Sequence, residues 1–178
     1  MKRNGHALVI GGTGMLTKVC IHLAHEGYSV SVIGRTHTKF EFLHVQSPDH
    51  SIFPLIVDYD TDDVFVEIGK ALEERGPFDL LVSWTPNYSL LEKVLEMNHA
   101  TERFRVFHVK GSKRYFEDEP IQVPSECDYR EIFLGFMVEE AESRWLTHKE
   151  IANGIINRIM TDEEGVIGQI HPYEARPR

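Results

Sequence analysis

The fold of this chain is decided by one stretch near its start, His6-Ala7-Leu8-Val9-Ile10-Gly11-Gly12-Thr13-Gly14-Met15-Leu16. An apolar run of strand type leads into a glycine-rich turn, and the turn leads into a helical pattern. Glycines let the backbone approach an anion closely, and the free N–H groups at the start of the helix point toward it. The stretch therefore predicts a nucleotide phosphate site with contacts from Gly11, Thr13, Gly14, Met15 and Leu16. The alternative is a turn that only connects the two elements.

Strand and helix signals alternate along the rest of the chain. The expected strands are residues 6–10, 29–33, 52–57, 79–84, 104–109, 131–138 and 166–170. The expected helices are residues 15–26, 39–45, 62–75, 89–98 and 147–160. Apolar strands separated by amphipathic helices are typical of a parallel sheet covered on both faces. The pattern predicts an α/β fold, a three-layer, doubly wound, Rossmann-like sheet of about seven strands in a single domain spanning residues 1–178.

Two segments depart from this alternation. Residues 110–129 contain Gly111, two prolines and many charges, and they predict a long loop in place of a crossover helix. Residues 171–178 predict a polar tail. Between them, Thr147 and Glu150 have the spacing of a capping box, which predicts that a helix begins there.

Composition narrows the function classes. The chain has 178 residues, 42% hydrophobic and 26% charged, which suits one globular domain with a real core. A net charge of −9 without a basic run argues against nucleic acid as a partner. No apolar run approaches the ~18 residues of a membrane span, so no membrane partner is expected. The two distant cysteines predict a reduced, cytoplasmic protein, and the scattered histidines lack the spacing of a metal site.

Residues 10–17 resemble the Thr-Gly-Gly-Thr-Gly-Phe-Ile-Gly segment of the short-chain dehydrogenase/reductase family, particularly its extended and atypical branches. They depart from it at Ile10, where the family has threonine, and at Thr17, where it has glycine. Thr17 also replaces the third glycine of the dinucleotide fingerprint. The resemblance covers residues 2–109 well and the remainder loosely. It implies an NAD(P)-binding Rossmann domain and an oxidoreductase activity.

The end of the second strand favours NADP over NAD. The carboxylate that holds the ribose of NAD is expected about 20 residues after the glycine turn. Gly34, Arg35 and Thr36 stand there instead. An arginine can pair with a 2′-phosphate through two hydrogen bonds and stack on adenine, so Arg35 and Thr36 are assigned to NADP. The alternative for Arg35 is a solvated side chain at a strand end.

Two further strand ends carry candidate cofactor contacts. Asp58 matches the family's aspartate that accepts a hydrogen bond from the adenine amino group, and its alternative role is a helix N-cap. Trp84 and Thr85 follow the fourth strand, where the family usually has Asn-Ala-Gly. Their position suits cofactor contact, because ligands gather at the carboxyl ends of parallel strands. Their residue types depart from the family, and Trp84 is alternatively a core or lid aromatic.

The family's catalytic pair, Tyr-x-x-x-Lys, is absent. In that pair the lysine lowers the pKa of the tyrosine, which donates a proton as hydride arrives. No tyrosine of this chain has a lysine four positions on: Tyr28, Tyr59, Tyr88, Tyr115, Tyr129 and Tyr173. The candidates for a substitute are Lys110, Ser112 and Tyr115, with Ser112 near the family's catalytic serine. Lys110 would tune Tyr115, or His108 would give the proton. The alternative is that the basic residues bind phosphate or stay solvated.

Two functions follow. The first is an NADP-dependent oxidoreductase that transfers hydride to or from a small carbonyl or alcohol substrate. The alternative is a non-catalytic NADP-binding sensor, which the missing tyrosine–lysine pair favours. A homo-oligomer is a further possibility, with residues 132–138 and the last strand as a candidate interface, although such apolar segments are more often interior.

Overall fold

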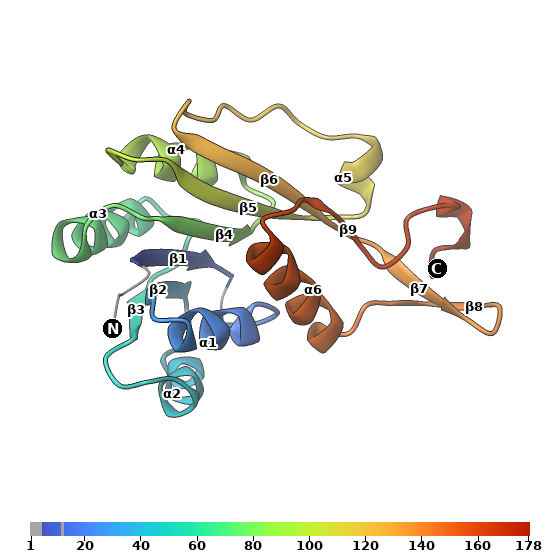
Figure 1. Ribbon diagram of the computed structural model, residues 1–178, viewed down its shortest axis with the longest axis horizontal. Coiled ribbons are helices and arrows are strands. Elements are labelled where there is room, and N and C mark those ends of the chain that lie inside the picture. The colour runs from blue at the N-terminus through green and yellow to red at the C-terminus, as the bar shows by residue number, and fades with distance from the viewer. Residues whose placement is uncertain (1–4, 12) are drawn as a thin grey trace.

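The computed structural model describes residues 5–11 and 13–178, and in this part of the chain a seven-stranded parallel sheet lies between two layers of helices (Figure 1). The strands are β1 (His6–Ile10), β2 (Ser29–Gly34), β3 (Ile52–Ile56), β4 (Leu80–Trp84), β5 (Phe104–Gly111), β6 (Cys127–Leu134) and β9 (Gly165–Ile167). Their order is β3-β2-β1-β4-β5-β6-β9, and neighbouring strands run parallel. The expected doubly wound, single-domain α/β fold is confirmed.

Helices cover both faces of the sheet, as Figure 1 shows. One face packs against α1 (Thr17–His25), α2 (His37–Gln46) and α6 (His148–Thr161). The other packs against α3 (Asp63–Arg75) and α4 (Tyr88–Met97). The structure's described helices include none long and apolar enough to cross a membrane.

The strand β1 lies in the middle of this sandwich, which explains its composition. Its five residues are all buried, with Ala7 and Val9 in the core beneath α1 and Leu8 and Ile10 in the core beneath α3. A strand covered on both faces is apolar at successive positions instead of alternating ones. The expected bounds of β1 are therefore exact, whereas α1 begins at Thr17, two residues later than expected, because the chain is still in turns before it.

The expected loop at residues 110–129 is wrong at both ends. The strand β5 continues through Gly111, a short helix α5 (Lys113–Phe116) follows, and β6 begins at Cys127. The connection without helix or strand is therefore residues 117–126. The charged residue Lys110 belongs to the buried end of β5, where carboxylates from other segments neutralise it. Composition alone does not reveal those partners.

The expected strand at residues 131–138 is in fact two strands. After β6, β7 (Phe136–Glu139) pairs with β8 (Glu142–Trp145) in a separate antiparallel hairpin, which projects from the body in Figure 1. The break falls at Gly135, where an added Cβ would lie 2.2 Å from the carbonyl oxygen of Gln169. The segment after β9 therefore packs tightly across this point and turns the chain out of the sheet.

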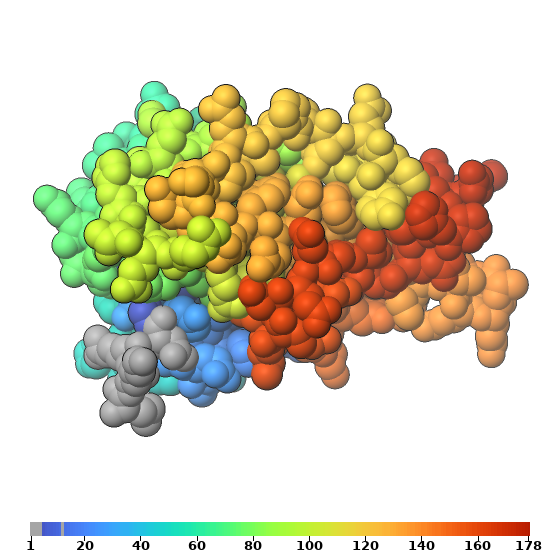
Figure 2. Space-filling model, turned by 45° about the horizontal axis from the view of Figure 1, so that its top comes forward, coloured from blue at the N-terminus to red at the C-terminus, as the bar shows by residue number. Residues whose placement is uncertain are grey.

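The C-terminal segment is also more ordered than a polar tail. It contains a 3₁₀ turn, η1 (Tyr173–Ala175), and the Tyr173 ring packs 4.6 Å from that of Phe116 on α5. The space-filling view in Figure 2 shows this red segment beside the orange hairpin at one end of the molecule, in agreement with Figure 1.

The expected capping box at the start of α6 is confirmed. The Glu150 backbone N–H donates to Thr147 Oγ1 at 3.1 Å, and the Thr147 N–H donates to Glu150 Oε1 at 2.9 Å. Two otherwise unpaired helix N–H groups are thus satisfied.

Candidate functional site

The glycine turn after β1 is closely packed against neighbouring strands at Gly11 and open to solvent at Gly14. Gly11 has φ +89°, and an added Cβ would lie 3.0 Å from the carbonyl oxygen of Trp84. An added Cβ on Gly34, at the end of β2, would lie 2.6 Å from Thr13 Cγ2. Gly14 is exposed, and an added Cβ there would meet nothing within 4 Å. Gly12 lies outside the described residues.

The start of α1 is suited to an anion. Its N-cap is Leu16, no described side chain caps its backbone N–H groups, and its first turn contains no acidic residue. Thr17, at the place of the missing third glycine, donates its hydroxyl to the Gly14 carbonyl oxygen at 2.7 Å and so closes the turn from below. Uncapped N–H groups and the positive end of the helix dipole favour a phosphate at this point.

Arg35 and Asp58 come together at the ends of β2 and β3. Arg35 Nη2 lies 2.9 Å from Asp60 Oδ2 and 3.3 Å from Asp58 Oδ1, and its guanidinium lies 5.1 Å from the Tyr59 ring centre. The arginine is therefore paired, although its side chain is half exposed. The sequence did not predict Asp60 as a partner of Arg35. Its position shortly after the end of β3 is the one signal that could have indicated this contact.

Asp58 does not act as the N-cap of the following helix, which was its alternative role. The N-cap of α3 is Asp62. Asp58 Oδ1 accepts a hydrogen bond from the Asp60 backbone N–H at 2.9 Å and so forms a local turn. Thr36 is the N-cap residue of α2, but its side chain makes no capping hydrogen bond with the described residues.

A cavity of about 580 Å³ opens at the carboxyl ends of β4, β5 and β6, beside the glycine turn. Its wall contains five of the residues that the sequence singled out, Met15, Trp84, Thr85, Lys110 and Ser112. Clefts of ~300–1,000 Å³ at the carboxyl ends of a doubly wound sheet are where such proteins bind small molecules. Thr85 is buried, and its hydroxyl oxygen accepts a hydrogen bond from the Asn87 N–H at 3.2 Å.

Part of this wall comes from segments that the sequence did not connect with it. Leu134 ends β6 and Gly135 follows it, Trp145 and Leu146 stand at the end of the hairpin, and Ile151 lies on α6. All but the glycine are apolar or aromatic. The hairpin itself was not expected, so its contribution was missed.

Lys110 is held by carboxylates and does not contact Tyr115. Its side chain is buried, and its Nζ forms ion pairs with Asp118 and, at 2.7 Å, with Glu131 Oε2. Burial lowers the pKa of Lys110, but the hydrogen bonds to Asp118 and Glu131 outweigh burial and raise it. Tyr88 donates its hydroxyl to Asp118 at 2.6 Å, and burial together with this bond raises the pKa of Tyr88 to about 12.

Tyr115 stands outside this cavity. Its side chain is exposed, and its ring lies 5.4 Å from Phe133 and 5.5 Å from His171. The predicted pairing of Lys110 with Tyr115 is therefore not formed. His108 is fully buried with Nδ1 2.7 Å from the Tyr129 hydroxyl, and it is not part of the cavity wall.

Ser112 has an unexpected hydroxyl partner. Its Oγ lies 3.1 Å from the Tyr173 hydroxyl oxygen, although the two residues are 61 positions apart. Ser112 lines the first cavity, and Tyr173 lines a second one of about 650 Å³ on the other side of α5. The pair therefore connects the two cavities. Residues 171–178 were expected only as a polar tail, and no local pattern indicates this contact.

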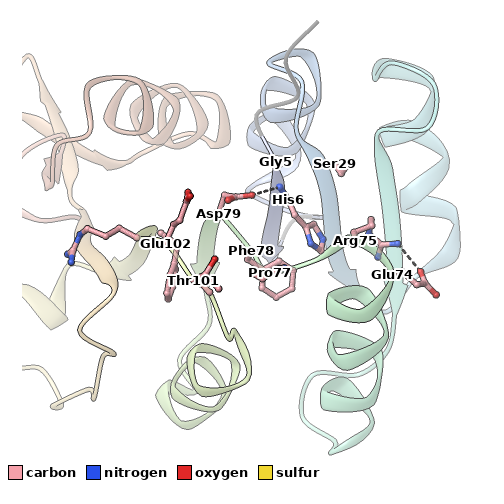
Figure 3. A pocket seen from close by; sticks show the side chains of 13 residues that line it. Gly5, His6, Ser29, Glu74, Arg75, Pro77, Phe78, Asp79, Thr101 and Glu102 are labelled. Atoms are coloured by element: carbon pink, nitrogen blue, oxygen red, sulfur yellow. Dashed lines mark hydrogen bonds and ion pairs between the residues drawn. The ribbon is translucent and has the colours of Figure 1, made fainter.

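A third cavity, of about 530 Å³, lies at the opposite edge of the sheet (Figure 3). There the His6 N–H donates to Asp79 Oδ2 at 2.8 Å, and Arg75 Nη1 pairs with Glu74 Oε2 at 2.9 Å. The His6 side chain is itself used, with Nδ1 2.9 Å from the Gly76 carbonyl oxygen and Nε2 2.6 Å from Ser31 Oγ. The predicted site residues do not line this cavity.

No protein-family model and no curated protein matches the sequence. Solved structures with the same fold do match. A SCOR enzyme from Clostridium thermocellum has a TM-score of 0.70 at 14% identity, with 93% of this chain and 91% of that chain covered. A betaketoacyl-ACP reductase from Bacteroides thetaiotaomicron has a TM-score of 0.69 at 16% identity, covering 94% and 98%. A glucose dehydrogenase from Caenorhabditis elegans has a TM-score of 0.66 at 13% identity, covering 93% and 96%.

These likenesses establish the fold, which is the Rossmann-like fold of short-chain dehydrogenase/reductase structures. They agree with the sheet order and with the resemblance carried by residues 10–17.

Proposed function

We propose that this protein binds a nicotinamide dinucleotide, preferentially NADP, and acts as an oxidoreductase on a small carbonyl or alcohol substrate in the cytoplasm. One observation carries the proposal. The glycine turn and the uncapped start of α1 lead directly into the cavity at the carboxyl ends of β4 and β5, and Met15 belongs to both. A cavity of this size beside a phosphate site favours an enzyme over the non-catalytic sensor.

The residues present fit the dinucleotide. The open backbone around Gly11, Thr13, Gly14, Met15 and Leu16 would hold the diphosphate, since an added Cβ at Gly14 meets only empty space. Arg35, Thr36 and Asp58 would hold the adenosine end. Trp84 and Thr85 would line the path to the cavity. When bound, the nicotinamide supplies or accepts the hydride.

The preference for NADP depends on how easily Arg35 exchanges partners. A 2′-phosphate at Arg35 would have to compete with Asp58 and Asp60. Exposed ion pairs of this kind contribute about 0–1 kcal/mol each, so releasing Arg35 costs little. A phosphate monoester carries a charge of about −1.5 to −2, against −1 for each carboxylate. The exchange therefore favours the phosphate.

Of the candidate catalytic residues Lys110, Ser112 and Tyr115, we assign proton delivery to Ser112. Its hydroxyl lines the cavity and would donate its proton to the carbonyl oxygen of the substrate. The Tyr173 hydroxyl, 3.1 Å away, would return a proton to Ser112 from the second cavity. Lys110 is assigned a positioning role, because its ion pairs fix Asp118 and Glu131 beside the end of β5. Tyr115 has no assigned step.

A charge at Gly14 tests the phosphate site. We expect NADPH to quench the fluorescence of Trp84 and Trp145 saturably, and Gly14→Asp to weaken binding about tenfold or more relative to the uncharged, equally sized Gly14→Asn, because a carboxylate repels the diphosphate. Gly14 is exposed and its φ is negative, which any L-residue can adopt, so both variants should fold. Equal affinities for the two variants, or no saturable quenching in the wild type, would contradict the proposal.

A further inference from the structure

The chemistry of the cavity wall identifies a class of substrate. Beyond the ends of β4 and β5, the wall includes the apolar or aromatic side chains of Leu134, Trp145, Leu146 and Ile151. Trp145 ends β8 and is half exposed, and its ring stands edge-on to Phe136 at 6.4 Å. The hairpin thus places an indole at the outer edge of a pocket that already contains Trp84 at its inner end. Such a wall contributes affinity through apolar contact.

The cationic side chains that line the cavity are largely neutralised. Lys110 is paired with both Asp118 and Glu131. Arg114 is paired with Glu119 at 3.3 Å and lies 5.1 Å from the Tyr88 ring centre. Lys113 is exposed at the outer surface, where water screens its charge. A carboxylate or phosphate that entered the buried part of the cavity would lose its hydration and would meet Lys110 and Arg114 already paired with carboxylates, which is costly.

The uncharged polar groups of the wall are few. The hydroxyl of Thr85 already accepts a backbone hydrogen bond, and the hydroxyl of Ser112 lies at the end of β5 beside Tyr173. The Tyr88 hydroxyl is donated to Asp118, so among the described residues of the wall Ser112 has the one hydroxyl bonded neither to the backbone nor to a carboxylate. This matches a ligand with one principal oxygen and an apolar body.

We propose that the cavity accepts an uncharged, largely apolar carbonyl compound or alcohol, with its oxygen at Ser112 and its apolar body between Trp84 and Trp145 of the β7–β8 hairpin. This inference deepens the proposed function by naming its substrate class. Carboxylated and phosphorylated substrates are disfavoured.

Two dyes with the same ring skeleton test the inference without turnover. N-phenyl-1-naphthylamine is uncharged, and 1-anilinonaphthalene-8-sulfonate carries an added sulfonate. We expect the protein to bind the uncharged dye about tenfold or more tightly than the sulfonate, because the sulfonate has no partner in the buried wall. The increase in dye fluorescence measures both affinities.

Variants of the hairpin assign this binding to the cavity. Trp145→Ala should weaken binding of the uncharged dye about fivefold or more, and Trp145→Phe should largely retain it, because an aromatic wall remains. Trp145→Lys should reverse the preference toward the sulfonate. The matched control is Val138→Ala, which changes an exposed apolar residue of the same hairpin outside the wall.

The results separate this inference from the proposed function. Equal affinity for the two dyes, or the same loss in Val138→Ala as in Trp145→Ala, would overturn the substrate class. NADPH titrations of the wild type and of Val138→Ala, which keep both reporter tryptophans, Trp84 and Trp145, report the dinucleotide site. If NADPH binds and the dye preference is absent, only the substrate inference fails. If the dye preference holds and NADPH does not bind, the proposed function fails.

Discussion

Arg35 is the residue on which the proposed preference for NADP depends. Its guanidinium touches two carboxylates and an aromatic ring, so its availability is set by neighbours from the end of β3. The same three contacts leave the Arg35 side chain half exposed, so its guanidinium is both paired and accessible to solvent. Substitutions that remove the charge of Arg35 or of a carboxylate beside it therefore test this role.

We expect Arg35→Ala to weaken NADPH binding about tenfold or more while changing NADH binding little, since only NADPH carries the 2′-phosphate. Asp60→Asn should strengthen NADPH binding, because it removes a carboxylate that competes for Arg35. Fluorescence titration with both dinucleotides measures these effects. Arg103→Ala, at an exposed arginine paired with Asp128 elsewhere, is the matched control. An equal loss of NADH and NADPH affinity in Arg35→Ala would rule out the assigned role.

A second residue, His108, links stability to pH. Burial, and then the nearby Lys110, lower the pKa of His108 to about 3. The unfolded chain has the ordinary histidine pKa of about 6.5. Between these two pH values only the unfolded state binds a proton at His108. The contribution of His108 to the free energy of unfolding is therefore fully present above about pH 7 and is lost as the pH falls below 6.5.

We expect the free energy of unfolding to fall by up to about 1.4 kcal/mol per pH unit below pH 6.5 from this group. Burial also lowers the pKa of His6, which adds to the fall. His108→Asn should reduce the slope, whereas His99→Asn, at an exposed histidine, should leave it unchanged. Urea unfolding between pH 5 and 8 measures this, and a slope unaffected by His108→Asn would contradict the argument.

At the scale of elements, α6 connects the capping box to the cavity. The hairpin leads into Thr147, α6 begins there, and its first turn places Ile151 in the cavity wall. Arg144 of β8 also pairs with Glu150 at 2.7 Å, which ties the hairpin to the helix. The hydrogen bond from the Arg144 side chain, and then the one from the Thr147 backbone N–H, lower the pKa of Glu150 to about 2.

We expect Thr147→Ala to destabilise the protein by about 1 kcal/mol, because the Glu150 N–H loses the hydroxyl oxygen that accepts its hydrogen bond. It should also weaken binding of the uncharged naphthylamine dye, as Ile151 loses its fixed position. Thr101→Ala, at an exposed threonine outside the helices, is the control for both measurements. An unchanged unfolding midpoint in Thr147→Ala would show that the cap contributes nothing.

At the scale of the whole molecule, the candidate site joins segments from the beginning, middle and end of the chain. Met15 comes from the first turn, Ser112 from the end of β5, and Tyr173 from the C-terminal segment. The parallel sheet makes this possible because it brings the carboxyl ends of its strands to one edge.

We expect Tyr173→Phe to lower kcat for NADPH-dependent reduction of an uncharged aromatic aldehyde about tenfold, with little change in KM, because proton return to Ser112 is impaired while binding is retained. Tyr28→Phe, at a half-buried tyrosine far from the cavity lining, is the control. Steady-state kinetics measure both. Equal kcat in Tyr173→Phe and the wild type would exclude the relay.

Local sequence patterns were sufficient to predict most of the fold. The apolar run at His6–Ile10, the glycine turn, the alternation of elements and the capping box at Thr147 are all signals within a few neighbouring residues, and the structure confirms the elements they predict. The placement of candidate residues at strand ends also followed, because parallel strands share one carboxyl edge.

The sequence by itself thus determined the sheet, its core and the edge at which ligands would bind, because periodicity and turn chemistry act over short distances. Only the tertiary structure decided what surrounds the candidate site. It paired Lys110 with Asp118 and Glu131, brought Tyr173 to Ser112, and turned the chain at Gly135 into a hairpin whose Trp145 lines the cavity. These contacts join residues up to 61 positions apart, and strand register and packing create them, which local pattern does not encode.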